Sequence, residues 1–181
     1  MEFIRGMSNL RQRHRGCVLT IGNYDGVHRG HQAVLTDLSA RARELDCPAA
    51  VVVFEPTPQE FFGGAKAPAR LSSLREKLRL LQASKVDRVI CVRFNRAVAA
   101  MTPQSFIEKL VEDGLGARHV TVGADFRFGR DRTGDFHTLV EAGNAGGYTV
   151  AATADFELDG TRVSSSAVRD ALAGGDLATA A

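Results

Sequence analysis

Gly22-Asn23-Tyr24-Asp25-Gly26-Val27-His28-Arg29-Gly30-His31 is the stretch of sequence that decides the fold. The apolar residues 17–21 precede it and predict a buried β-strand. Residues 28–45 follow with the period of a helix, because Val34 and Leu38 are spaced to share one face. Ligands of parallel α/β sheets bind at the carboxyl ends of the strands. This strand, loop and helix therefore predict a binding loop at the edge of such a sheet.

The rest of the chain alternates short apolar runs with longer segments of helical period. This alternation predicts an α/β fold with a mainly parallel central sheet flanked by helices, in one domain over residues 1–181. Strands are expected at 49–54, 88–92, 119–122 and 148–152, and helices at 72–83, 102–114, 135–145 and 165–173. Residues 62–68 are rich in Gly, Ala and Pro and predict a mobile loop.

The composition is that of an ordinary globular protein. Apolar residues make up 44%, charged residues 24%, and the net charge is +2. This balance gives no reason to expect a nucleic-acid or membrane partner, and no apolar run reaches the roughly 20 residues of a membrane span. No signal peptide is evident at the start, and Cys17, Cys47 and Cys91 form no metal-like or redox-like pair. A cytoplasmic location is expected.

The decisive stretch carries a phosphate-binding pattern. Gly22 and Gly26 allow a tight turn, and the following helix start offers free N–H groups to a phosphate. His28 and His31 share one face of the first turn, while Gly30 leaves out a side chain where a nucleotide would pack. The glycine spacing fits neither a Walker loop nor a dinucleotide fingerprint. The pair suits stabilisation of a phosphoryl group in transfer; surface histidines or a metal site are the alternatives, and no third metal ligand is evident nearby.

A second motif, residues 163–169, places three hydroxyls at a helix start and Arg169 one turn further along. Taken alone, it indicates ordinary N-capping and a solvated arginine. Beside the histidine pair, hydroxyls, helix N–H groups and a guanidinium favour a polyphosphate cradle.

A third motif, residues 122–129, follows the strand expected at 119–122. Phe126 and Phe128 would clamp a flat ring, and Asp125 would accept hydrogen bonds or help to hold a cation. The alternative is a strand end with two core aromatics.

Together these motifs resemble the N-terminal half of the bacterial bifunctional riboflavin kinase/FMN adenylyltransferases, also called FAD synthetases. The matched segments extend along the whole chain. They are residues 22–31, 54–58 and 70–77, residues 122–129 with Arg132, Gly134 and Asp135, and residues 163–169 with Gly175, Asp176 and Leu177. The first and last also resemble the wider His-x-Gly-His nucleotidyltransferase superfamily, whereas the middle three point to the flavin branch. The resemblance implies a Rossmann-like nucleotidyltransferase fold.

The resemblance also implies transfer of AMP from ATP to FMN, with Mg²⁺, giving FAD and pyrophosphate. It implies catalytic roles for His28, His31 and Arg169. Residues on the ATP side would be Gly22, Asn23, Asp25, Gly26, Gly30, Ser165 and Ser166. The FMN side would be lined by the segment 54–62, with Phe54, Pro56, Pro58 and Phe62 as its named residues, together with Asp125 and Phe128. The metal ligands are not identified.

The chain departs from the family pattern at several points. Tyr24 stands where Phe is usual and Ser166 where Thr is usual, and both changes keep the chemistry. Thr57 stands where His or Gln is frequent, so we assign it no catalytic role. The family continues into a riboflavin kinase β-barrel. Residues 1–181 are therefore expected to be one half of a longer protein or a stand-alone half, without riboflavin kinase activity.

Two other functions remain open on the sequence. One is adenylyl or cytidylyl transfer to another phosphorylated acceptor, such as phosphopantetheine or nicotinamide mononucleotide, against which the flavin-side motifs argue. The other is a nucleotide- or flavin-binding module without turnover, against which His28, His31 and Arg169 argue.

Overall fold

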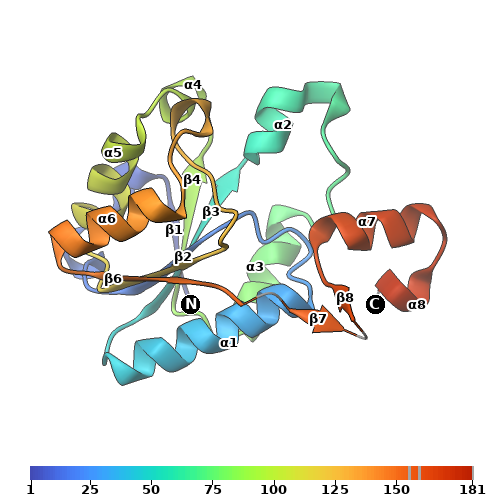
Figure 1. Cartoon of the computed structure of the whole chain (residues 1–181), viewed down its shortest axis with the longest axis horizontal. Helices are drawn as coiled ribbons and strands as arrows, with labels where there is room; N and C mark the ends of the chain where they lie inside the picture. The colour runs from blue at the N-terminus through green and yellow to red at the C-terminus, as the bar shows by residue number, and fades with distance from the viewer. Residues whose placement is uncertain (155, 159, 181) are drawn as a thin grey trace.

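The centre of the molecule is a six-stranded sheet in which every neighbouring pair of strands is parallel (Figure 1). The structure is a computed structural model, and it describes residues 1–154, 156–158 and 160–180. The strands are β1 Glu2–Arg5, β2 Val18–Ile21, β3 Ala49–Glu55, β4 Arg88–Arg93, β5 His119–Val122 and β6 Thr149–Ala152. Their order is β1-β4-β3-β2-β5-β6. The chain moves outward from β2 in both directions, so the crevice between the carboxyl ends of β2 and β5 is the expected ligand site.

Helices cover both faces of the sheet. The helices are α1 Arg29–Glu44, α2 Pro58–Gly63, α3 Leu74–Ala83, α4 Arg96–Ala99, α5 Pro103–Phe106, α6 Phe136–Gly146, α7 Ser165–Ala173 and α8 Leu177–Ala180. Of these, α1 and α3 pack on one face and α5 and α6 on the other, whereas α2, α7 and α8 stand away from the sheet. The chain continues beyond α5 as a π-helix, Ile107–Glu112. Short 3₁₀ turns lie at Met7–Asn9, Gln12–His14, Gly64–Lys66 and Arg130–Arg132.

Alternating side chains of the strands build two apolar cores. In β2, Val18 packs with Leu35 and Leu38 of α1 on one face. Leu19 packs on the other face, in the core that contains Leu139 of α6. The interior strands β2, β3, β4 and β5 are buried on both faces and largely apolar, which is why they could be predicted from the sequence.

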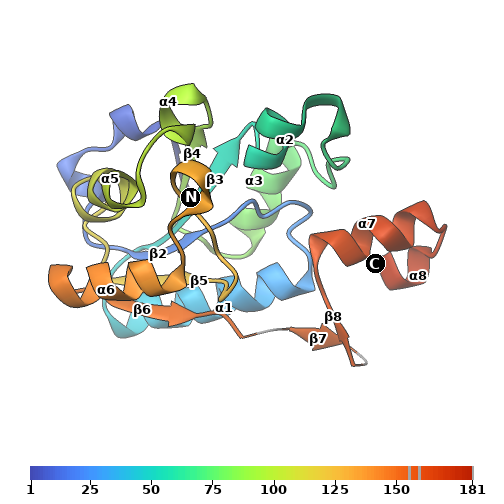
Figure 2. The ribbon, with the colours of Figure 1, turned by 45° about the horizontal axis from the view of Figure 1, so that its top comes forward.

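The C-terminal segment leaves the sheet after β6. It forms a hairpin of β7 Glu157–Leu158 and β8 Thr161–Arg162, then α7 and α8. Figure 2 shows this segment beside the N-terminal end of α1. No helix in the described ranges combines the length and apolar character needed to cross a bilayer.

The predicted α/β fold and its mainly parallel sheet are confirmed, with one correction. Residues 62–68 are not a simple loop, because α2 runs through Gly63 and a 3₁₀ turn follows at Gly64–Lys66. The sequence contains the start signal for α2: Thr57 caps the helix, proline occupies its first turn, and Glu60 closes a capping box. Strands β1, β7 and β8 and helices α4 and α8 were not predicted.

Candidate active site

The loop between β2 and α1 is tightly wound. Tyr24, Gly26 and Val27 all have positive φ angles, of 49°, 78° and 42°. A β-branched residue such as valine rarely adopts this conformation, so surrounding contacts must hold the loop. Tyr24 is buried, and its hydroxyl lies 2.7 Å from the Thr20 hydroxyl. At Gly26 a Cβ would lie 3.0 Å from Leu71, so a side chain there would meet both strain and a close neighbour.

His28 and His31 form a stacked pair at the start of α1. Their ring centroids are 3.7 Å apart with an interplanar angle of 19°. His28 is the N-cap residue, and its Nδ1 accepts a 3.3 Å hydrogen bond from the backbone N–H of His31. Because Nδ1 accepts, the proton of the neutral His28 imidazole is assigned to Nε2, which makes Nε2 a donor.

Both imidazoles are held neutral. Burial, together with a smaller effect of the neighbouring His28, lowers the pKa of His31 to about 3. Burial also lowers the pKa of His28, although the charge of Asp25 partly opposes this shift. At neutral pH the pair therefore offers N–H hydrogen bonds to a developing charge and carries no positive charge of its own.

The Asp25 carboxylate binds the segment before α3. It accepts 3.0 Å hydrogen bonds from the backbone N–H groups of Leu71 and Ser72, and one of 3.2 Å from the Ser72 hydroxyl. Burial would raise the pKa of this carboxyl, but these hydrogen bonds and the charge of Arg169 outweigh burial and lower the pKa. Asp25 is therefore an ionised anchor of the loop.

Arg169 reaches the same anchor from α7. Its Nη2 donates to Asp25 over 2.6 Å, and its Nε donates to the Ala69 carbonyl over 2.6 Å. The neighbouring Ser165 hydroxyl donates to the Asp25 carbonyl oxygen over 3.1 Å. The second and first sequence motifs, although far apart in the chain, are therefore joined at Asp25.

A smaller cavity, of about 290 Å³, opens over the histidine pair. Its polar lining comes from both ends of the chain and includes His28, His31, Ser164, Ser165 and Arg162. Gly30 also lines it, and a Cβ there would lie 3.3 Å from both the His28 ring and the Val163 carbonyl oxygen. The glycine therefore permits the helix start, the His28 ring and the chain before α7 to approach one another closely.

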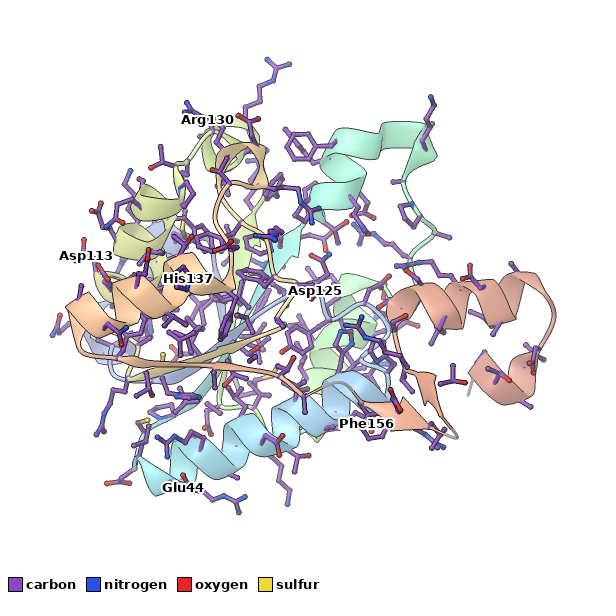
Figure 3. The ribbon with its side chains drawn as sticks, viewed as in Figure 1. Glu44, Asp113, Asp125, Arg130, His137 and Phe156 are labelled. Atoms are coloured by element: carbon purple, nitrogen blue, oxygen red, sulfur yellow. The ribbon has the colours of Figure 1, made fainter. Side chains whose placement is uncertain are left out.

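A larger cavity, of about 1300 Å³, adjoins the smaller one. Seven phenylalanines line it, namely Phe54, Phe61, Phe62, Phe94, Phe106, Phe126 and Phe128. Arginines line it as well, at positions 96, 127, 130 and 132. Gly22, Asp125 and Phe126 line both cavities. In Figure 3, Asp125 lies between Arg130, which lines the larger cavity, and Phe156, which lines the smaller one.

The structure brings most of the predicted site residues to these two cavities. Those that line at least one of them are Gly22, Asn23, His28, Gly30, His31, Ser165, Phe54, Pro58, Phe62, Asp125 and Phe128. Pro56, in the turn after β3, lines neither cavity, and neither does the exposed Ser166. Asp25, Gly26 and Arg169 also lie outside both linings, because their polar groups hold the loop and the segment before α3 together.

Sequence reasoning missed part of the aromatic wall. Phe94 and Phe106 line the larger cavity but belong to two separate segments, whereas Phe61 lies within the segment 54–62 that was expected on the FMN side. Phe94 contacts both Phe61 and Phe62, with ring centroids 5.3 and 5.8 Å apart. Only the fold brings these rings together, so no local spacing could have found them.

Known proteins resemble this chain in fold or in sequence. A macrolide-efflux protein from Streptococcus pneumoniae superposes with a TM-score of 0.85 over 99% of this chain and 59% of its own, at 22% identity, which supports the fold alone. The bifunctional riboflavin kinase/FMN adenylyltransferase of Pseudomonas fluorescens is 52% identical over 176 residues. Those of Escherichia coli strain K12 and Haemophilus influenzae are 51% and 45% identical over 181 and 177 residues.

The match covers nearly all of this chain but only part of its relatives. The three alignments cover 97%, 99% and 98% of the chain, and 56%, 58% and 58% of the relatives. The sequence profile described as FAD synthetase matches residues 10–167, which is most of the sequence. The chain therefore belongs to the FAD synthetase family.

Proposed function

We propose that the chain transfers AMP from ATP to FMN, giving FAD and pyrophosphate. One observation carries the proposal: a polar cavity over a histidine pair adjoins an aromatic cavity, and the two share Gly22, Asp125 and Phe126. Flat rings stack favourably on aromatic side chains, and a helix start with N–H donors suits phosphate. A flavin ring in the larger cavity would direct its phosphate toward a nucleotide bound over the histidines.

The chemistry is a direct in-line displacement. A phosphate oxygen of FMN attacks the α-phosphorus of ATP, and pyrophosphate leaves with the electrons of the broken bond. FMN already supplies an oxyanion, so no protein nucleophile is required. His28 Nε2–H and the second imidazole, His31, would donate to charge that grows on the transferring group, and preorganised donors of this kind stabilise a transition state strongly.

Arg169 is proposed to complete the polyphosphate side. Guanidinium carries five N–H donors, and the bonds to Asp25 and Ala69 use Nε and Nη2. Nη1 makes no hydrogen bond to a described residue and would be free to donate to a phosphate oxygen. Ser165 and the exposed Ser166, at the start of α7, would add hydroxyl and backbone donors.

The proposal includes a Mg²⁺ ion that would bind together with the phosphates of ATP. The described residues contain no group of three His, Cys, Asp or Glu side chains that could hold a metal by themselves. Mg²⁺ usually keeps several waters and binds through one or two carboxylates plus substrate phosphates. The exposed carboxylate of Asp125, which lines both cavities, fits that role. Bound there, Mg²⁺ would neutralise part of the phosphate charge.

The proposal extends to the domain organisation and the location of the protein. Residues 1–181 would act as one nucleotidyltransferase domain, since a single sheet carries both apolar cores. A riboflavin kinase domain would accompany it in the full-length protein, as the names of the relatives suggest. The three free cysteines agree with a cytoplasmic location.

An acceptor panel tests the proposal. The purified chain is incubated with Mg²⁺, ATP or CTP, and FMN, nicotinamide mononucleotide or phosphopantetheine, and the products are separated by chromatography. We expect FAD from ATP and FMN, and little product from the other pairs. A preference for another acceptor would refute the assignment. With ATP made chiral by sulfur at the α-phosphorus, direct transfer predicts inversion, whereas retention would indicate a covalent enzyme intermediate.

A further inference from the structure

A short segment before α3 links the two halves of the site. We define it as the 69–72 strap, Ala-Arg-Leu-Ser. On one side, Asp25 accepts hydrogen bonds from Leu71 and Ser72, and Arg169 donates to the Ala69 carbonyl. The strap is therefore fixed to the loop under the histidine pair and to α7.

On its other side the strap is fixed to the start of α2. The Arg70 guanidinium forms ion pairs with both Glu55, at the end of β3, and Glu60, in the first turn of α2. Its Nη2 also donates to the Glu60 Oε2 over 2.8 Å. The same Glu60 Oε2 accepts a 2.8 Å hydrogen bond from the Thr57 backbone N–H, as part of the capping box. One carboxylate thus starts α2 and holds Arg70.

Beyond its first turn, helix α2 is held by the contacts of Phe61 and Phe62 with Phe94. It has six residues, and none of them is buried. Figure 1 shows α2 beyond the carboxyl end of β3, standing away from the sheet. It nevertheless carries Phe61 and Phe62, which line the larger cavity. Phe62 is 72% exposed, so the position of this aromatic wall depends on how the start of α2 is anchored.

We propose that Arg70 is a positioning residue for the flavin acceptor: by joining Glu60 to the strap, it sets the α2 aromatic wall relative to the histidine loop. This inference rests on the proposed function. Arg70 lines neither cavity, so its effect reaches the flavin through Phe61 and Phe62. Because it acts on the acceptor side, its loss should weaken FMN binding and leave ATP binding and the chemical step nearly unchanged.

The variants separate charge, geometry and folding. Arg70→Met removes both ion pairs, and Arg70→Lys keeps the charge but lacks the planar fork that reaches two carboxylates. Glu60→Gln keeps an oxygen for the Thr57 cap and removes the charge that Arg70 binds. Arg75→Met is the matched control, since Arg75 is an exposed arginine of α3 that forms no hydrogen bond or ion pair with the described residues.

FMN binding is measured by quenching of flavin fluorescence, which needs no turnover. We expect Arg70→Met to raise the Kd and KM for FMN by fivefold or more, and kcat and the KM for ATP to change by less than twofold. Arg70→Lys and Glu60→Gln should lie between this variant and the wild type, and Arg75→Met should match the wild type. Unchanged FMN binding in Arg70→Met, or equal losses of FMN and ATP binding, would overturn the role of Arg70.

A second measurement follows α2 directly. The chain has no tryptophan, so Phe62→Trp introduces a single reporter on this helix. In the Arg70→Met background its fluorescence anisotropy should fall relative to the Arg70 background, and equal anisotropy would contradict the proposal. If Arg70→Met does not fold, Arg70→Lys and Glu60→Gln decide by the same criteria. Failure of the wild-type chain to bind FMN at all would instead refute the proposed function.

Discussion

The Asp25 carboxylate and the Arg169 guanidinium lie 2.6 Å apart and join positions 144 residues apart in the chain. The side chains are only 8% and 19% exposed, so the pair is largely shielded from water. It connects the loop after β2 to α7, and through Ala69 both are connected to the 69–72 strap. The loop after β2 and helix α7 thus meet at one charged contact, and Gly22 of the loop and Ser165 of α7 both line the cavity over the histidines.

Replacement of Arg169 tests this contact. Arg169→Lys restores the charge, but an ammonium cannot hold Asp25 and Ala69 in one plane while donating to a phosphate. We expect kcat/KM for ATP to fall about tenfold or more, because hydrogen bonds to charged groups contribute about 1.5–3 kcal/mol. Steady-state kinetics with ATP and FMN varied in turn measure this loss, which should depend little on the flavin. Wild-type values for Arg169→Lys, equal to those of an Arg79→Lys control on α3, would remove Arg169 from the site.

His28 has two roles that variants can separate: its side chain caps the N-terminus of α1, and its Nε2–H is the proposed catalytic hydrogen-bond donor. His28→Asn keeps a side-chain acceptor at the N-cap, whereas His28→Ala loses it. Both lose the imidazole N–H, so both should lower kcat by about a hundredfold, the typical cost of one preorganised donor. Only His28→Ala should also lower the melting temperature. The exposed His137 of α6 provides the control, and a normal kcat with a raised KM for ATP in His28→Asn would refute the assigned role.

Stability should fall as the pH falls below about 6.5 because His31 is buried in its neutral form. Its pKa is about 3 in the folded chain and about 6.5 when unfolded. Between these values the unfolded chain binds more protons, so the free energy of unfolding rises with pH and is fully retained above 6.5. Urea unfolding between pH 5 and 7.5, above the range where carboxyls titrate, should show a steeper loss for the wild type than for His31→Gln. Parallel pH profiles would show that His31 is not the group responsible.

The aromatic wall can be tested without disturbing the core. Phe62 is 72% exposed, so Phe62→Ala should leave the melting temperature unchanged. Stacking of a flat base on an aromatic side chain is worth about 1–3 kcal/mol, which predicts FMN binding weakened by about fivefold to a hundredfold. Fluorescence quenching of FMN gives the affinity, with the exposed Leu80→Ala on α3 as control. Equal affinities in the two variants would place the flavin elsewhere.

The interior strands could be predicted from the sequence because their physics is local. A parallel strand buried on both faces is a continuous apolar run, and the run at 49–54 corresponds to β3, Ala49–Glu55. The edge strand β1, Glu2–Arg5, has only one fully buried residue and gives no such run. The hairpin strands β7 and β8 are two exposed residues each, so their pairing depends on neighbouring structure that local patterns do not encode.

In the site, too, local patterns could be predicted and contacts between distant segments could not. His28 and His31 could be identified together because their spacing alone places them on one helical turn. The contact of Asp25 with Arg169 could not, since it depends on how the fold places α7 beside the loop after β2. Helix α2 is a different case, because its capping box was present in the sequence. Pro58 was expected on the FMN side and not at a helix start, although proline is also favoured in the first turn of a helix.

The central claim is direct transfer of AMP to FMN, and the fate of the α-phosphorus tests it most directly. The purified chain is incubated with FMN, Mg²⁺ and ATP labelled at the α-phosphorus, and labelled products and pyrophosphate are counted together. The account predicts labelled FAD and one pyrophosphate for each FAD, with both products lost together in His28→Asn. Binding of both FMN and ATP without any labelled FAD would contradict it and would make the chain a binding module.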